Sequence, residues 1–163
     1  MYYGAIKKLD IANGPGVRVS IFVSGCRNHC HGCFNPETWN FAYGEEFTDE
    51  TLNDVMEALK HPNVTGISIL GGDPFEPENQ ACVLDICEKV KTSMPDKDIW
   101  VWTGYEFDEL KELPIMRYID VLVDGRFEES KKDLRLKWRG SSNQRVISVQ
   151  ESLETGEIIL CSE

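Results

Sequence analysis

Three cysteines gather in one short segment of the chain and could bind iron. Cys26, Cys30 and Cys33 follow a CxxxCxxC spacing that places three thiols on one loop. A cluster of four irons normally takes four cysteine thiolates, so a loop with three leaves one iron open to a ligand that is not protein. The spacing therefore predicts a reactive iron-sulfur cluster. The remaining cysteines have no spacing that would build a second cluster: Cys82, Cys87 and Cys161.

A structural zinc site is the alternative interpretation of the same segment. Zinc takes four ligands in a closed tetrahedral arrangement, and His29 or His31 could complete a set of three cysteines and one histidine. Such a site would make the chain a zinc-stabilised binding module rather than an enzyme. The cysteine segment taken alone leaves both interpretations open.

The elements around this segment alternate between strands and helices. Residues 17–23 alternate apolar and polar side chains, which predicts a strand that runs directly into the cysteine segment. An apolar spacing of i, i+3, i+4 and i+7 predicts a helix over residues 49–61, with Thr48 as its N-cap. Further elements are expected in this order: a strand at 64–70, a helix at 78–93, a strand at 98–103, a short helix at 107–112, and strands at 119–124, 145–149 and 157–160. This alternation predicts an α/β fold with a mostly parallel sheet and helices outside it.

Two of the expected strands end in segments that could bind a ligand. The cysteine segment follows the strand at 17–23, and the sequence Gly-Gly-Asp-Pro at 71–74 follows the strand at 64–70. Gly71 and Gly72 allow a tight turn and a close approach of the backbone to a ligand. Since reactive groups gather on the loops after the carboxyl ends of parallel strands, the two segments are expected to meet at one edge of the sheet.

Several further segments, taken in order with the cysteine segment, resemble a known enzyme family. The chain is similar to the radical S-adenosylmethionine (SAM) enzymes and, among them, to the activators of glycyl radical enzymes. It most resembles the branch that activates anaerobic ribonucleoside-triphosphate reductase. The resemblance covers roughly residues 1–147 and is carried by these segments: residues 10–18, 22–25, 26–33, 71–74, 100–105, 120–127 and 138–144.

The resemblance implies a fold and two cofactors. The fold would be an incomplete (β/α) barrel of the radical SAM type with mostly parallel strands. A [4Fe-4S] cluster would be held by Cys26, Cys30 and Cys33, and SAM would bind at its open iron. Many radical SAM enzymes carry an aromatic residue just before the third cysteine, whereas this chain has a glycine there and an aromatic residue just after it. The residues expected to contact the cofactor are Gly32, Cys33, Phe34, Gly71, Gly72 and Asp73.

Other residues are weaker candidates for the same site. Thr103 and Gly104 end the expected strand at 98–103 and could touch the methionine or ribose part of SAM. Asp124 and Asn143 are candidates of the same kind. Three tryptophans are expected to serve packing rather than cofactor binding: Trp100, Trp102 and Trp138.

The family resemblance implies a protein substrate. A 5′-deoxyadenosyl radical from SAM would abstract hydrogen from a glycine in the large subunit of the reductase, and reduced flavodoxin or a similar protein would donate the electron. Two alternatives share this chemistry: an activator of a formate-lyase-type glycyl radical enzyme, and a small radical SAM enzyme that modifies a nucleotide.

Length and charge agree with a small enzyme that does not bind nucleic acid. The chain has 163 residues, which suits a single domain over residues 1–163. Its net charge of −11 disfavours a nucleic-acid groove, because neutralising phosphates requires clustered basic residues. The densest basic stretch, at 131–139, fits either a solvated loop or a patch that faces an acidic partner. Without a signal peptide or an apolar run of about 18 residues, we expect a cytoplasmic protein with no membrane segment.

Overall fold

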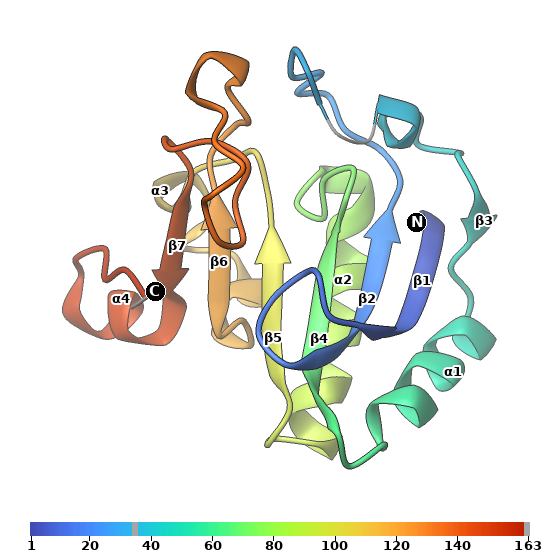
Figure 1. The fold of residues 1–163 in the computed structure, drawn as a ribbon. Helices are drawn as coiled ribbons and strands as arrows, with labels where there is room; N and C mark the ends of the chain where they lie inside the picture. The colour runs from blue at the N-terminus through green and yellow to red at the C-terminus, as the bar shows by residue number, and fades with distance from the viewer. Residues whose placement is uncertain (34–35, 162–163) are drawn as a thin grey trace.

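A single mixed sheet with helices on one side forms the framework of the molecule (Figure 1). The computed structural model describes residues 1–33 and 36–161, so the predicted contact residue Phe34 lies outside the described residues. Over these residues the sheet has seven strands in the order β3-β1-β2-β4-β5-β6-β7. The strands are β1 (Tyr2–Asp10), β2 (Val17–Val23), β3 (Glu45–Glu46), β4 (Val64–Gly71), β5 (Asp98–Trp102), β6 (Val121–Asp124) and β7 (Arg145–Ser148).

The described residues also form four α-helices and three short 3-10 helices, all of which except α4 lie between strands. The helices are α1 (Asp49–Leu59), α2 (Pro77–Ser93), α3 (Phe107–Leu110), α4 (Val149–Thr155), η1 (Pro36–Trp39), η2 (Pro114–Arg117) and η3 (Glu129–Lys131). Thr48 caps α1 as predicted, because its hydroxyl accepts a hydrogen bond from the Thr51 N–H. No helix in the described part of the chain is both long and apolar enough to cross a membrane.

The middle of the sheet is parallel and its flanks are antiparallel. Strands β2, β4, β5 and β6 pair in parallel, whereas β1 pairs antiparallel with β2 and β3, and β7 pairs antiparallel with β6. The predicted α/β class is confirmed, with parallel pairing limited to the middle. The sheet does not close on itself, so the expected barrel is not confirmed. An antiparallel pair needs only a short connection, and the six residues 11–16 provide it between β1 and β2.

One face of the sheet is covered by helices and carries the hydrophobic core. Helix α2 lies behind β4 in Figure 1, and α1 packs beside β1 and β2. Alternate strand residues, such as Ile21, Ile69 and Val101, are fully buried against the apolar sides of these helices. Burial of this continuous apolar layer is the main source of stability of the fold.

The opposite face is more polar, and the loop at 11–16 crosses it (Figure 1). Arg18 is fully buried there, pairs with Asp98 at 2.5 Å and donates to the Ser68 hydroxyl at 2.7 Å. Its guanidinium also donates to the Pro15 carbonyl at 3.1 Å, while the Ser68 hydroxyl donates to the Asn13 carbonyl at 2.6 Å. These bonds fix the 11–16 loop over the sheet. They also offset the free-energy cost of burying the Arg18 charge.

The C-terminal part of the chain differs from the sequence-based prediction. The predicted strand at 157–160 is wrong, because this segment makes only an isolated bridge between Leu160 and Ile147. Helix α4 ends at Thr155, and its C-cap residue Gly156 takes a left-handed conformation with φ of 76°. A Thr-Gly sequence that favours a hairpin turn therefore ends a short helix here, since glycine also serves as a helix C-cap.

Candidate functional site

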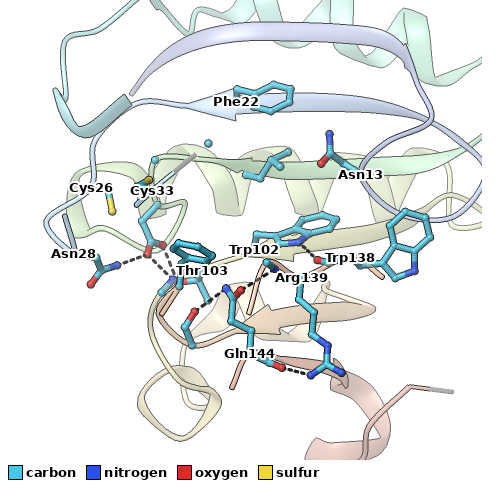
Figure 2. Close-up of a pocket in the computed structure, with 18 of the residues that line it drawn as sticks. Asn13, Phe22, Cys26, Asn28, Cys33, Trp102, Thr103, Trp138, Arg139 and Gln144 are labelled. Carbon is cyan, nitrogen blue, oxygen red and sulfur yellow. Dashed lines mark hydrogen bonds between the residues drawn. The ribbon is translucent and has the colours of Figure 1, made fainter. Parts of the chain in front are cut away.

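A cavity of about 420 Å³ lies on the polar face of the sheet, where parallel strands end (Figure 2). Figure 2 shows Cys26 and Cys33 at one end of the view and Asn13 and Trp138 at the other. Loops after β2, β4, β5 and β6 all contribute to it, as the topology predicts. Its lining residues include Asn13, Phe22, Cys26, Asn28, Cys33, Leu70, Gly71, Gly72, Asp73, Trp102, Thr103, Gly104, Phe127, Leu134, Trp138 and Gln144.

The cysteine loop is fastened to η1 by main-chain hydrogen bonds. The Gly25 N–H donates to the Thr38 carbonyl at 2.6 Å, and the Cys26 N–H donates to the Trp39 carbonyl at 3.2 Å. Cys33 closes the loop by donating to the Cys30 carbonyl at 3.0 Å. Gly32 takes a left-handed conformation, with φ of 74°, which allows the chain to reverse just before Cys33.

The structure brings two of the three predicted ligands to the cavity. Cys26 and Cys33 line it, and Cys30 lies outside its lining. In residues 1–33 and 36–161, no three side chains of the His, Cys, Asp and Glu types are already gathered closely enough to hold one metal ion. Ligand binding that draws such a loop together contributes its free energy to ordering the loop.

Burial governs the protonation of the cysteine thiols. It raises the pKa of Cys26 to about 11, against an opposing effect of hydrogen bonds from the backbone of Asn28 and His29. Burial also raises the pKa of Cys30. Both thiols therefore keep their protons at neutral pH, and a metal that binds them would have to displace these protons.

The two histidines of the loop make contacts that do not involve the cysteines. The His29 ring stacks on Trp39, with ring centroids 4.4 Å apart and planes 15° from parallel. His31 is exposed, and its Nε2 lies 2.9 Å from a carboxylate oxygen of Glu129. Neither arrangement supports the alternative of a zinc site with three cysteines and one histidine.

The Gly-Gly-Asp segment docks directly on the base of the cysteine loop. The Gly72 N–H donates to the Val23 carbonyl at 2.7 Å, and the Asp73 N–H donates to the Gly25 carbonyl at 2.8 Å. A Cβ atom on Gly72 would lie 2.7 Å from the Gly25 carbonyl oxygen and 2.9 Å from that of Thr38. Gly72 is therefore required by the packing of two backbones, in addition to any role towards a ligand.

Asp73 is a buried centre of hydrogen bonding. One carboxylate oxygen accepts from the Thr103 hydroxyl at 2.7 Å and the Phe75 N–H at 3.0 Å, and the other accepts from the Gly104 N–H at 2.9 Å and the Asn28 amide at 3.1 Å. Burial raises its pKa to about 6, although the hydrogen bonds from Gly104, Phe75 and Thr103 act in the opposite direction. Asp73 thus joins the cysteine loop to the end of β5.

Glu76 is a functional neighbour that sequence reasoning missed. Its carboxylate is fully buried and accepts hydrogen bonds from the Arg27 N–H at 3.1 Å and the Arg27 guanidinium at 3.0 Å. The Tyr105 hydroxyl donates to its other oxygen. Glu76 therefore fastens the start of the cysteine loop to the start of α2. A single glutamate before a helix carries no sequence signal of such a contact.

The far wall of the cavity is formed partly by residues expected only to pack. Trp100 is buried, but Trp102 and Trp138 line the cavity as well as packing together. Thr103 and Gly104 lie in the wall, as proposed from their place after β5. Lining residues that the sequence did not single out include Phe22, Asn28, Leu70 and Gln144. Phe22 and Leu70 alternate with core residues along their strands, so the sequence pattern could have placed their side chains on the cavity face of the sheet.

Two further candidates lie elsewhere. Asp124 is buried under α3, accepts from the Phe107 N–H at 2.8 Å and pairs with Arg145 at 2.6 Å. Asn143 donates to the Arg126 carbonyl at 2.8 Å. Neither residue is among those that line the cavity.

Comparison with known proteins agrees with this site. A family model described as a 4Fe-4S single cluster domain matches residues 12–147. A protein of Enterobacteria phage T4 is 42% identical over 91% of this chain and 94% of its own length. Relatives from Vibrio cholerae serotype O1 and Escherichia coli K12 are 45% and 43% identical, over 88% and 90% of this chain and 96% and 97% of their own lengths. All three are named anaerobic ribonucleoside-triphosphate reductase-activating protein. The chain therefore belongs to the family of anaerobic ribonucleoside-triphosphate reductase-activating proteins, iron-sulfur enzymes with a 4Fe-4S single cluster domain.

Proposed function

We propose that this chain activates anaerobic ribonucleoside-triphosphate reductase by forming a glycyl radical on the large subunit of that enzyme. The observation that carries the proposal is the cavity where the cysteine loop meets the Gly-Gly-Asp segment, in a chain whose relatives are named as activators of the reductase. A cavity with cysteines at one end suits a cofactor that reacts with a group brought from outside.

The donor set fits a [4Fe-4S] cluster with one open iron. Cys26, Cys30 and Cys33 would bind three irons, and SAM would bind the fourth. When bound, these two cofactors would supply one chemistry: transfer of one electron from the reduced cluster to SAM would release methionine and give the 5′-deoxyadenosyl radical that takes hydrogen from the glycine α-carbon. The chain itself supplies position and the exclusion of water.

Residues of the loops after β2 and β4 would position SAM. We assign the carbonyl groups of Gly71 and Gly72 to the SAM ammonium, and we place Gly32 and Cys33 beside the cofactor. The Asp73 carboxylate already accepts four hydrogen bonds, so its role would be to hold Asn28 and the end of β5 at the cavity wall. Phe34, the remaining contact proposed from the sequence, belongs to the segment that the structure does not describe.

The scaffold and the electron donor complete the proposal. We propose that residues 1–163 form one domain, in which the open sheet corresponds to the incomplete barrel of radical SAM enzymes. An open sheet leaves one side of the cavity accessible to a segment of another protein. Reduced flavodoxin or a similar one-electron donor would reduce the cluster.

The test combines the two proteins under strictly anaerobic conditions. The reconstituted chain, SAM, a reductant and the large reductase subunit should give a doublet in the electron paramagnetic resonance spectrum. Deuteration of the reductase glycine at its α-carbon should collapse the doublet splitting. Cleavage of SAM with a doublet only on a formate-lyase-type partner would overturn the proposed substrate. Absence of SAM cleavage would overturn the proposed chemistry.

A further inference from the structure

The loop at residues 131–142, here called the mouth loop, stands at the open side of the cavity. Its two arms meet in an isolated antiparallel bridge between Lys132 and Ser141. The indole N–H of Trp102 donates to the Trp138 carbonyl at 2.6 Å, which fastens the loop to the end of β5. Leu134 and Leu136, from the middle of the loop, both line the cavity.

Gln144 fixes the base of the mouth loop. Its side-chain oxygen accepts from the N–H groups of Gly140 at 3.0 Å and Ser141 at 3.1 Å. Its amide donates to the Gly125 carbonyl at 3.1 Å, beside the end of β6. Since these bonds restrict the base of the loop, less conformational entropy is lost when a partner binds to it.

Leu134 is an apolar side chain on this fixed support. It is 84% exposed and yet contributes to the cavity lining, so it stands at the mouth rather than inside. A single exposed leucine is ordinary on a protein surface. A leucine held by a hydrogen-bonded loop at the opening of the cavity is a preorganised apolar contact, and a partner that covers it gains the free energy of burying its side chain at a small entropic cost.

We propose that Leu134 and the mouth loop bind the glycine-bearing segment of the reductase and guide it into the cavity. This inference rests on the proposed function, because it assigns the surface through which that protein substrate is recognised. A segment that enters the cavity past the mouth loop brings the residues beside its glycine against Leu134. Leu134 then packs on an apolar side chain of that segment and loses its exposure to water.

The charge of the mouth loop adds a second property of the partner. The exposed basic side chains of the loop are Lys131, Lys132, Arg135 and Lys137, in a chain with a net charge of −11. Arg135 is held by two hydrogen bonds of 3.0 Å to the Asp133 carboxylate. A local basic surface on an acidic protein favours a partner surface that carries carboxylates and speeds its approach. The expected occupant is therefore an apolar glycine-bearing segment with acidic residues beside it.

The experiment separates recognition of the partner from cleavage of SAM. Leu134→Ser is compared with Leu160→Ser, a matched change at a leucine that is 58% exposed and does not line the cavity. Lys137→Glu is compared with Lys89→Glu on α2. For each variant, the glycyl radical formed on the large reductase subunit is measured against subunit concentration, and SAM cleavage is measured without the subunit.

Leu134→Ser should raise the half-saturating concentration of the reductase subunit about tenfold, as expected when a buried leucine contact is lost. Lys137→Glu should raise it as well, by an amount that shrinks in high salt. Both variants should retain wild-type cluster content and SAM cleavage, and both controls should behave as wild type.

If Leu134→Ser has the same half-saturating concentration of the reductase subunit as its control, the inference is overturned and the proposed function stays intact. Loss of SAM cleavage in Leu134→Ser would place this residue in the cofactor site and also overturn the inference. Absence of any glycyl radical with the wild-type chain would instead overturn the proposed function.

Discussion

At the scale of single residues, the site depends on carboxylates that hold other groups in place. Asp73 and Glu76 are both buried, and each accepts hydrogen bonds from a residue of the cysteine loop. Asp73 reaches Asn28, and Glu76 reaches Arg27, so two neighbours of Cys26 are fixed from the side of α2. A buried carboxylate is costly unless it is fully hydrogen-bonded, and this arrangement satisfies that condition.

The three cysteines of the loop should differ sharply from the other three in their effect on iron. Replacement of Cys26, Cys30 or Cys33 by alanine should abolish reconstituted iron and sulfide. A [4Fe-4S] site with only three thiolate ligands cannot lose one of them and still hold the cluster. The matched controls are alanine at each remaining cysteine. Of these, Cys87→Ala should lower stability by about 1 kcal/mol because its thiol is fully buried, without loss of iron. The control cysteines are Cys82, Cys87 and Cys161. Loss of iron in one of these controls equal to that at Cys30 would contradict the ligand assignment.

The raised pKa of Asp73 predicts a pH effect on stability. The pKa is about 6 in the folded chain, against an ordinary value of 3.8, so the folded state binds this proton more tightly than the unfolded state. The contribution of Asp73 to the free energy of unfolding therefore falls as pH rises through this range. In cluster-free protein, the stability of wild type relative to Asp73→Asn should be larger at pH 5.5 than at pH 7.5, by about 1 kcal/mol. Urea unfolding measures both values, and a constant difference would contradict the shift.

At the scale of elements, the sequence predicts helices and strands best where the local side-chain pattern matches the burial of the same residues in the structure. The strand at 17–23 and the cap at Thr48 are confirmed, because side-chain alternation and the local hydrogen bond of a cap are properties of short segments. Strand β1 was not predicted, since all but one of its residues are exposed or only partly buried and little apolar alternation results. Its place in the sheet comes from pairing with β2, which is a property of the whole chain.

The same distinction applies to the site. Cysteine spacing and paired glycines are legible in sequence, and Cys26, Cys33, Gly71 and Gly72 all line one cavity. The contribution of Gln144 could not be predicted, because its four bonding partners are defined by the path of the mouth loop. A polar side chain in a charged segment carries no sign of the backbone groups that it will meet.

The contact between the Gly-Gly-Asp segment and the cysteine loop predicts an effect of Gly72→Ala on the cluster. The added methyl group would meet backbone atoms of Gly25 and Thr38, so the cysteine loop must shift. Iron content should fall severalfold, and the melting temperature should drop by several degrees. Gly156→Ala is the control, because its new methyl group meets no atom within 4 Å and only the left-handed conformation is strained. It should lower the melting temperature while iron content stays at the wild-type level. Normal iron content in Gly72→Ala would show that the two loops are not coupled.

At the scale of the whole molecule, stability and reactivity lie on opposite faces of one sheet. The helices bury the apolar residues of β2, β4 and β5 on one side, and the cavity opens on the other. The cysteine loop is attached to this framework by main-chain hydrogen bonds and by Asp73 and Glu76. Because the core and the cavity lie on different faces, the cysteine loop can change conformation while the core keeps its packing.

Removal of the cluster should therefore loosen the loop without unfolding the sheet. Anaerobic chelation of iron would take away the ligand that we propose gathers the three thiols, and burial keeps the freed Cys26 and Cys30 thiols protonated. Amide hydrogen exchange should become faster at residues 25–33 and in the Gly-Gly-Asp segment that docks on them. Protection in β4, β5 and α2 should remain, because their apolar contacts lie on the far face and include no residue of the cysteine loop. The far-ultraviolet circular dichroism spectrum should stay the same within error. A cooperative loss of protection across β4 and α2 would show instead that the cluster is a structural part of the core.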